Sequence, residues 1–443
     1  MLLAHVIRNL STKQFRAVNK IPAYIRWCLS GTPIQNTLID LGALVAFLGV
    51  PILKEPATFR KYIDNSSHSL KANSQNEFKN LRFLLGSICL RRSKTILPLF
   101  GLKMEERRPQ FSTREREEYR QLQIKCKRAI DLAVSGHNTK ETHQSVIEAL
   151  LRLRLFCNNG STEESDKSSP FPRDPEETLS MLQQSGDAIC QYCSCDILSM
   201  SGSGSPEPVH LTECCRVVCG ECRIQYQHDL ENAQASGKNS CPFCSDGHGV
   251  DNILPKETGD RMAIAAARKI YPSKLMVLLE DIQRNSLQEK SIIFSFWKKS
   301  LNLVGDLFKA NDVRYYCVDG SLSLGKRKAV LSEFQGSQEV GVLIMTLGTG
   351  AVGLNNLSVA SRIYLLEPQW NPSVENQAIG RIFRLGQGKP VTVIRYIMDK
   401  TIEESVESKQ LRKLRLARGG FDSKSSTQRI EQLQQLKALV LHS

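Results

Sequence analysis

The sequence predicts an α/β protein whose parallel sheet is covered by helices on both faces, with a small metal-bound module placed ahead of that sheet. Three observations predict this class. Continuous apolar runs of strand length alternate with helical periods after residue 270, which is typical of strands buried on both faces. A similar alternation fills residues 1–157. Between them the cysteines fall in Cys-x2-Cys pairs, a pattern that favours metal binding over disulfides in an intracellular chain.

The predicted strands and helices follow one another and are divided into blocks by polar segments. The first block has a short β-rich run at residues 24–29 and helices at residues 38–48, 78–92 and 115–132, and it closes on the stretch at residues 150–155. Polar segments rich in Ser, Glu, Asp and Pro then indicate linkers. The strands expected in the last block are residues 291–296, 315–318, 342–346 and 362–366.

These patterns divide the chain into six segments. They are an α/β block at 1–157, a linker at 158–186, a cysteine module at 187–247, a second linker at 248–269, the parallel-sheet lobe at 270–400 and a helical C-terminal tail at 401–443.

Charge and hydropathy narrow the class of partner. The 443 residues include 59 basic and 45 acidic side chains, a formal charge of +14, which favours a polyanion such as nucleic acid. A merely basic soluble protein would carry the same charge. The longest apolar run, residues 41–53, contains Gly and Pro and is too short to span a bilayer, so no membrane partner is expected. The N-terminus lacks the regions of a secretory signal.

Several blocks of the last segment occur in a familiar order. Residues 290–297, 350–355 and 377–387 resemble motifs IV, V and VI of the Swi/Snf family of helicase-like DNA translocases, and residues 29–36 resemble its motif III. Residues 319–321 and 367–373 resemble the segments between these motifs. The resemblance implies a RecA-like C-terminal helicase lobe and a partial N-terminal RecA-like lobe.

The resemblance also assigns roles to residues. It makes Arg381 and Arg384 arginine fingers on a γ-phosphate, with Gln377 helping to position them, and a planar, always-charged guanidinium suits that chemistry. Singly, a Gly-rich turn is usually only a turn, and paired arginines usually form a solvated face. The residues expected to contact DNA or couple it to the nucleotide are Ser30, Gly31, Thr32, Gly350, Gly353 and Asn355.

One segment imitates a nucleotide site. Residues 320–327 nearly spell a phosphate-binding P-loop, but Arg327 stands where a Ser or Thr would bind magnesium. We therefore expect a loop that starts a helix.

The ATP site itself is incomplete in this sequence. Residues 2–9 resemble the family's acidic box, but Leu2 and Leu3 occupy the carboxylate positions and cannot ligate magnesium. No P-loop lysine precedes them, so ATP and magnesium are expected only in a full-length form. A gene model that starts too late, which would make this an inert fragment, and a genuine remnant without catalysis both fit. Under either explanation, the N-terminal lobe is expected to contain a partial sheet with an exposed edge.

The cysteine module resembles a RING finger with two zinc ions. In the RING cross-brace, Cys190, Cys193, Cys219 and Cys222 hold one ion, whereas Cys214, Cys241 and Cys244 hold the other with one further ligand. Arg216 stands at the usual histidine position and has no lone pair to offer. Cys215 or His210 must therefore substitute, and Cys195 is interpreted as a spare thiol.

The expected function is that of the C-terminal part of a nuclear, DNA-dependent ATPase of helicase superfamily 2, of the chromatin-remodelling or DNA-repair type, with duplex DNA as its partner. A RING inserted between motor lobes is typical of the helicase-like transcription factor branch, where it recruits a ubiquitin-conjugating enzyme. The alternative is therefore a RING ubiquitin ligase or adaptor on a DNA-binding platform. A purely structural zinc knot, worth ~10–16 kcal/mol per site, is the third interpretation.

The sequence predicts that this chain alone does not hydrolyse ATP, because Leu2 and Leu3 supply no magnesium ligand. Phosphate release from the purified chain, measured with and without duplex DNA, is expected to stay at background. DNA-stimulated turnover within the ~1–10³ s⁻¹ range of ordinary enzymes would contradict the prediction.

Overall fold

The computed structural model describes most of the chain in separate stretches. They are residues 2–3, 7–10, 12–31, 33–34, 38–64, 78–92, 100–135, 139–160, 178–179, 182, 188–195, 197, 209–212, 216–235, 242–243, 271–285, 289–337, 341–348 and 357–419.

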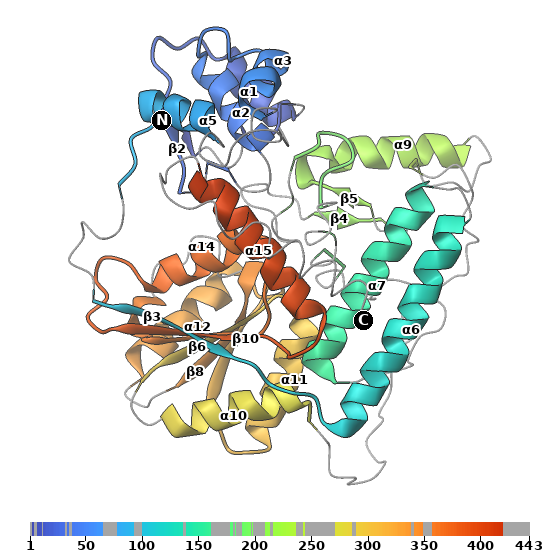
Figure 1. The fold of residues 1–443 in the computed structure, drawn as a ribbon, viewed down its shortest axis with the longest axis vertical. Coiled ribbons are helices and arrows are strands. Elements are labelled where there is room, and N and C mark those ends of the chain that lie inside the picture. Colours follow the sequence, from blue (N-terminus) through green and yellow to red (C-terminus); the bar gives the residue numbers. More distant parts are fainter. Residues whose placement is uncertain are drawn as a thin grey trace.

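A six-stranded sheet, parallel throughout, forms the body of the C-terminal lobe (Figure 1). Its strand order is β3-β10-β9-β6-β8-β7. The four strands expected from the sequence are present. The bounds are β3 Leu102–Arg107, β6 Ser291–Ser295, β7 Tyr315–Val318, β8 Val342–Thr346, β9 Arg362–Leu365 and β10 Val391–Tyr396.

Neighbouring residues of each central strand enter different cores, which is the expected result for a sheet buried on both faces. Ile292 and Phe294 pack on one face with α12 (Leu324–Gly336) and α14 (Pro372–Ile382). Ile293 packs on the other face with α10 (Ser273–Asn285) and α11 (Lys298–Lys309). The predicted fold class is confirmed.

The first predicted block, residues 1–157, forms two separate parts in the structure. Its last part, β3 with α6 (Thr113–Ser135) and α7 (Thr139–Asn159), packs on the C-terminal lobe, and β3 pairs with β10 from Leu102 to Arg107. The sequence did not predict β3, because its Leu-Lys-Met-Glu-Glu-Arg run lacks a buried alternation. Helix α6 begins earlier than expected because Ser112 and Glu115 form a capping box.

The rest of the first block forms a small helical unit, drawn in blue in Figure 1. Helix α2 has the predicted bounds, whereas the predicted 78–92 helix is shorter and the β-rich run is reduced to two residues. The elements are β1 Leu2–Leu3, α1 Lys13–Lys20, β2 Cys28–Leu29, α2 Leu38–Leu48, α3 Pro56–Phe59, a π-helical turn Arg60–Asp64 and α5 Lys79–Ile88. Strands β1 and β2 pair in parallel, so the predicted partial sheet is present as two strands.

The cysteine module is built around an antiparallel pair and one helix. The elements are β4 His210–Leu211, β5 Val217–Val218, a 3-10 turn Gly220–Cys222 and α9 Arg223–Ala235. Its core consists of the cysteines with a few aliphatic and aromatic side chains. A turn Leu357–Val359 and the last helix, α15 Ile402–Gly419, complete the described elements. Among the described residues, no helix is both long and apolar enough to cross a bilayer.

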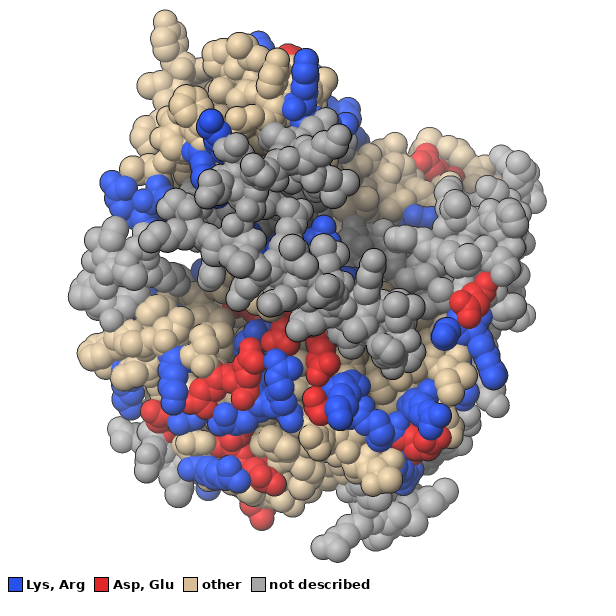
Figure 2. Space-filling model, viewed as in Figure 1, with Lys and Arg blue, Asp and Glu red and all other residues tan. Residues whose placement is uncertain are grey.

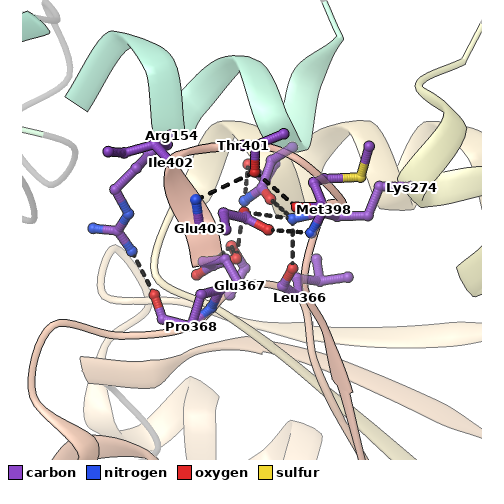
Figure 3. Close-up of polar contacts among 12 residues, drawn as sticks. Arg154, Lys274, Leu366, Glu367, Pro368, Met398, Thr401, Ile402 and Glu403 are labelled. Carbon is purple, nitrogen blue, oxygen red and sulfur yellow. Dashed lines mark hydrogen bonds and ion pairs between the residues drawn. The ribbon is translucent and has the colours of Figure 1, made fainter. Parts of the chain in front are cut away.

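A fully buried ion pair joins α10 to the start of α15 (Figure 3). Lys274 Nζ lies 2.6 Å from Glu403 Oε1, and both side chains have 0% exposure. The ammonium also donates to Asn158 Oδ1 of α7 at 2.8 Å and to Leu366 O after β9 at 3.0 Å. Glu403 Oε2 accepts from Met398 N at 2.8 Å. Four elements therefore meet at this one pair.

We predict that Lys274→Met lowers the free energy of unfolding by about 3–5 kcal/mol, because it leaves the carboxylate of Glu403 buried and unpaired. Chemical denaturation followed by circular dichroism measures it. The double variant Lys274→Met/Glu403→Leu is expected to lose less than the sum of the single losses.

The matched control is Arg284→Ala on the same helix, whose exposed pair with Glu280 is worth about 0.2–1 kcal/mol. Equal losses for Lys274→Met and the control would show that the buried pair does not hold the lobe together.

Candidate functional sites

Four cysteines of the module converge into one cluster. The sulfurs of Cys190, Cys193, Cys219 and Cys222 all lie within 4.8 Å of one another, and all four residues are buried. Cys193 Sγ is 3.6 Å from Cys219 Sγ. This is the grouping that the RING cross-brace predicts for the first ion.

The cluster fits a tetrahedral zinc ion. Zn–S bonds of about 2.3 Å in a tetrahedron place the sulfurs about 3.8 Å apart, close to the separation of Cys193 and Cys219. Cys219 N donates to Cys190 Sγ at 3.4 Å, the kind of contact that supports a metal-bound thiolate. The neighbouring thiols of Cys193 and Cys195 hold the pKa of Cys190 below its ordinary value. The described cluster could therefore hold zinc.

The second predicted ligand set, Cys214, Cys215, Cys241 and Cys244, lies outside the described residues. Arg216 is exposed, as expected for a side chain that cannot ligate a metal. Its backbone oxygen accepts from Thr212 N at 2.9 Å, and its backbone nitrogen donates to Thr212 Oγ1 at 2.9 Å. His210 packs against Tyr226 at 5.1 Å between ring centroids, and Tyr226 stacks on Phe243.

Helix α14 carries the predicted arginine pair. Gln377 is exposed and Arg381 is half-buried, both within the helix, whereas Arg384 is half-buried in the turn that follows. The helix ends at Ile382, with Phe383 N donating to Ile379 O. Two arginines three residues apart predict a pair on one helix, but α14 ends between Arg381 and Arg384, so they lie on either side of the helix end.

Both ends of this segment are fixed by buried side chains. Glu375 Oε1, in the first turn, accepts from Gln369 N at 2.7 Å and from Gln410 of α15. Burial raises the pKa of Glu375, and Arg395 on β10 opposes that shift. After the helix, Gln387 Nε2 donates to Ala360 O at 2.8 Å. The stretch that holds Arg381 is thus clamped to three other elements.

Helix α14, which carries Arg381, begins near the point where the order of the strands in the sheet reverses. From β6 the chain builds β7 and β8 on one side, and it then crosses to β9 and β10 on the other side. In open α/β sheets, ligands bind at the carboxyl edge of such a switch point. Here Glu367, just after β9, accepts from Phe296 N at 2.5 Å and from Ser295 Oγ at 3.1 Å, which ties the ends of β6 and β9 together.

A buried arginine lies near this carboxylate and bonds the residue that follows it. Arg154 of α7 donates from Nη2 to Pro368 O at 2.7 Å (Figure 3). Its guanidinium also lies over the ring of Trp370, at 5.5 Å. Burial lowers the pKa of Arg154, and the nearby charges of Glu367 and Glu403 oppose this. Burial likewise raises the pKa of Glu367. Asn158 Nδ2 of the same helix donates directly to Glu367 Oε2 at 2.9 Å.

Sequence reasoning missed this network. A usable signal was present, because Arg154 interrupts the apolar stretch at residues 150–155 and Lys274 precedes the apolar run at residues 275–279. Such isolated charges on apolar faces need a buried partner.

The remaining predicted residues are only partly placed. Ser30 and Gly31 follow β2 directly, whereas Thr32, Gly350, Gly353 and Asn355 lie outside the described residues. The P-loop imitation behaves as expected for a helix-start loop, since Ser323 caps α12. Arg327 Nη2 folds back onto Gly320 O at 2.6 Å.

One face of the C-terminal lobe is covered by paired charges. Figure 2 shows Lys and Arg interleaved with Asp and Glu in a band over the region of β3. Arg107 contacts both Glu105 at 3.0 Å and Asp281 at 3.2 Å, and Arg108 contacts Glu407 at 3.0 Å. Cations paired in this way form a poor phosphate-binding surface, and they protect the edge strand from pairing with another chain.

Two models of known protein families match this chain, one in each lobe. The family model for the SNF2-related domain matches residues 4–162, and that for the helicase conserved C-terminal domain matches residues 273–386. The chain is 30% identical to DNA repair protein RAD5A of Arabidopsis thaliana, over 98% of this chain and 44% of that protein. It is also 30% identical to helicase-like transcription factor of Oryctolagus cuniculus, over 97% of this chain and 44% of that protein.

The human helicase-like transcription factor is 29% identical, over 95% of this chain and 42% of its own length. The chain thus spans less than half the length of these relatives. Among solved structures, the C-terminal part of the Fun30 ATPase domain matches with a TM-score of 0.39 and 17% identity, over 70% of this chain and 90% of that one.

Proposed function

The chain belongs to the family of SNF2-related, helicase-like proteins, and from that premise we propose that it is the C-terminal part of a nuclear DNA-dependent ATPase that moves along duplex DNA. The name of one relative, DNA repair protein RAD5A, supports a role in DNA repair. The observation that carries the proposal is the clamped α14 segment, which starts at the carboxyl edge of the sheet and holds Arg381 and Arg384 half-buried at its other end, near the turn that precedes β9.

The clamps matter because phosphoryl transfer is catalysed mainly by positioning and by charge. Glu375 and Gln387 hold the two ends of the segment through buried hydrogen bonds, so the helix is preorganised before a nucleotide arrives. Arg381 and Arg384 then supply positive charge to a γ-phosphate that a complete ATP-binding lobe holds, and Gln377 orients them. ATP and magnesium belong to that lobe.

DNA contact is proposed for the loops at strand ends. Ser30 and Gly31 after β2 are small residues whose backbone can approach a phosphate closely, and the same role is proposed for Thr32, Gly350, Gly353 and Asn355. Such contacts read the sugar-phosphate chain and not the base sequence.

A second function is favoured by the aromatic contacts of the cysteine module. Tyr192, between the first two cysteines, packs on Phe243 at 5.3 Å and donates to Asp229 Oδ2 of α9 at 2.8 Å. We propose that this contact between Tyr192 and Phe243 forms part of a platform for a ubiquitin-conjugating enzyme. Discharge of ubiquitin from a preloaded conjugating enzyme, which needs no ATP, tests this function apart from the motor.

We predict that Arg381→Ala and Arg384→Ala each lower ATP turnover by about 10³-fold or more when this chain is joined to a complete ATP-binding lobe. DNA affinity is expected to stay nearly unchanged, because an arginine finger acts on the charge of the transition state. Phosphate release and DNA binding across a salt series measure both quantities.

The matched control is Arg284→Ala, an exposed arginine of the same lobe. Arg381→Lys keeps the charge but loses the guanidinium fork, so it should recover only part of the rate. Weaker, more salt-sensitive DNA binding with unchanged turnover would instead assign these arginines to a solvated basic face.

We predict about two zinc ions per chain, because the described four-cysteine cluster accounts for one and the second predicted ligand set for another. Elemental analysis of the purified protein should lose both ions in the variant Cys190→Ser/Cys241→Ser. A stoichiometry near one in the unaltered protein would mean that Arg216 has abolished the second site.

A further inference from the structure

The last helix, α15, separates its charges along its length. Its acidic residues, Glu403, Glu404 and Glu407, all precede residue 408, whereas residues 408–419 contain five Lys or Arg and no acidic side chain. The acidic half is tied into the lobe, because Glu403 pairs with Lys274 and Glu407 pairs with Arg108. The positive charge of the second half is therefore not neutralised from within the helix.

Three of these cations form one side of α15, which we call its basic side. Lys409 and Arg412 are exposed and Arg415 is half-buried, and a spacing of three residues makes them neighbours along the helix. Gln410 points elsewhere, since it is buried and donates to Glu375 of α14. Within the part of the chain that the structure describes, the three cations form no ion pair and no hydrogen bond.

Lys413 is not part of this set, because a carboxylate already acts on its charge. Burial lowers the pKa of the Lys413 ammonium, and the charge of Asp40 on α2 opposes that shift.

The basic side begins at the carboxyl edge of the sheet. Lys409 Nζ lies over the ring of Trp370, at 4.6 Å, and Trp370 belongs to the loop that follows β9. The loop after β8, which holds residues 350–355, leaves the sheet at the same edge, because β8 and β9 both run parallel to β6. DNA contact was proposed above for that loop, so the basic side starts next to the expected position of a duplex.

We propose that the basic side of α15 binds the phosphates of duplex DNA. This rests on the proposed function, in which DNA is the partner, and it adds a helix surface to the loops. Unpaired Lys and Arg side chains displace condensed counterions from DNA, which stabilises the complex at low salt. The cations over β3 are already paired with carboxylates. The competing interpretation is a solvated basic face that touches no partner.

The test measures binding of the whole chain to a duplex of arbitrary sequence, by fluorescence anisotropy over a series of salt concentrations. Lys409→Gln, Arg412→Gln and Arg415→Gln should each make the slope of log affinity against log salt concentration less negative by about 0.9. If the contact contributes nothing at 1 M salt, that slope means about eightfold weaker binding at 0.1 M. The triple variant should change the slope by about 2.7.

The matched control is Arg284→Gln, which removes one exposed positive charge from an arginine paired with Glu280. It should leave the slope unchanged, and it therefore separates a phosphate contact from a mere loss of net charge.

A triple variant that binds DNA with the slope of the unaltered chain would overturn the inference and leave the proposed motor function standing. A triple variant that keeps its DNA affinity but loses binding to polyglutamate would assign the basic side to an acidic protein partner, which also overturns the inference. Failure of the unaltered chain to bind duplex DNA at low salt would refute the proposed DNA partner, and this surface with it.

A measurement on the unaltered chain covers the case in which the triple variant does not fold. Exposed lysines are acetylated with an N-hydroxysuccinimide ester, with and without duplex DNA, and quantified by mass spectrometry. DNA should slow the acetylation of Lys409. Lys309, exposed at the end of α11 where the chain approaches the opposite edge of the sheet, should react equally in both samples. Equal reaction of Lys409 in both samples would overturn the inference.

Discussion

The ammonium of Lys274 and the carboxylate of Glu403, both removed from water, hold the C-terminal lobe in its arrangement. Taking two charges out of water costs several kcal/mol per ion, and the loss is offset only when every remaining donor and acceptor is satisfied. Asn158, Leu366 and Met398 supply those contacts, and they come from different segments of the chain. The pair thus specifies one relative placement of these segments, since any other leaves a charge unpaired.

Helix α14, which carries Arg381, is linked to this ion pair through Asn158 and Glu367. Asn158 contacts Lys274 with its carbonyl oxygen and Glu367 with its amide, so the ion pair and the crevice of the sheet share one side chain. Glu367 fixes the ends of β6 and β9, and the chain then runs directly into α14. A continuous chain of hydrogen bonds therefore joins the ion pair to the strand ends that precede α14.

The sequence predicted the central sheet well because β6, β8 and β9 are continuous apolar runs, which have few other folded uses. It did not predict β3, whose charged side chains are stabilised by pairing with β10 and by ion pairs that no local pattern reveals. For the sites, the spacing of the cysteines predicted the four residues that the structure brings together, whereas the roles of Arg381 and Arg384 follow from motif order and stay a prediction. The partners of Arg154 and Lys274 could not be predicted, since they lie more than ninety residues away in the sequence.

The end of α7 and the start of α10 lie close together, and the cysteine module is inserted between them in the sequence. Gly160, at φ +67°, ends α7 so close to α10 that a Cβ placed on it would lie 3.0 Å from Pro272 Cβ. Glu115 fastens the same corner by accepting from Ser112 N and Ser273 N, each at 2.9 Å. Segments that leave and rejoin a domain at one point are the ones that tolerate insertion and removal. Residues 161–270 are therefore an insertion in the lobe, whereas Tyr271 already packs on its core, and a short tether from Gly160 to Tyr271 could replace the whole insertion.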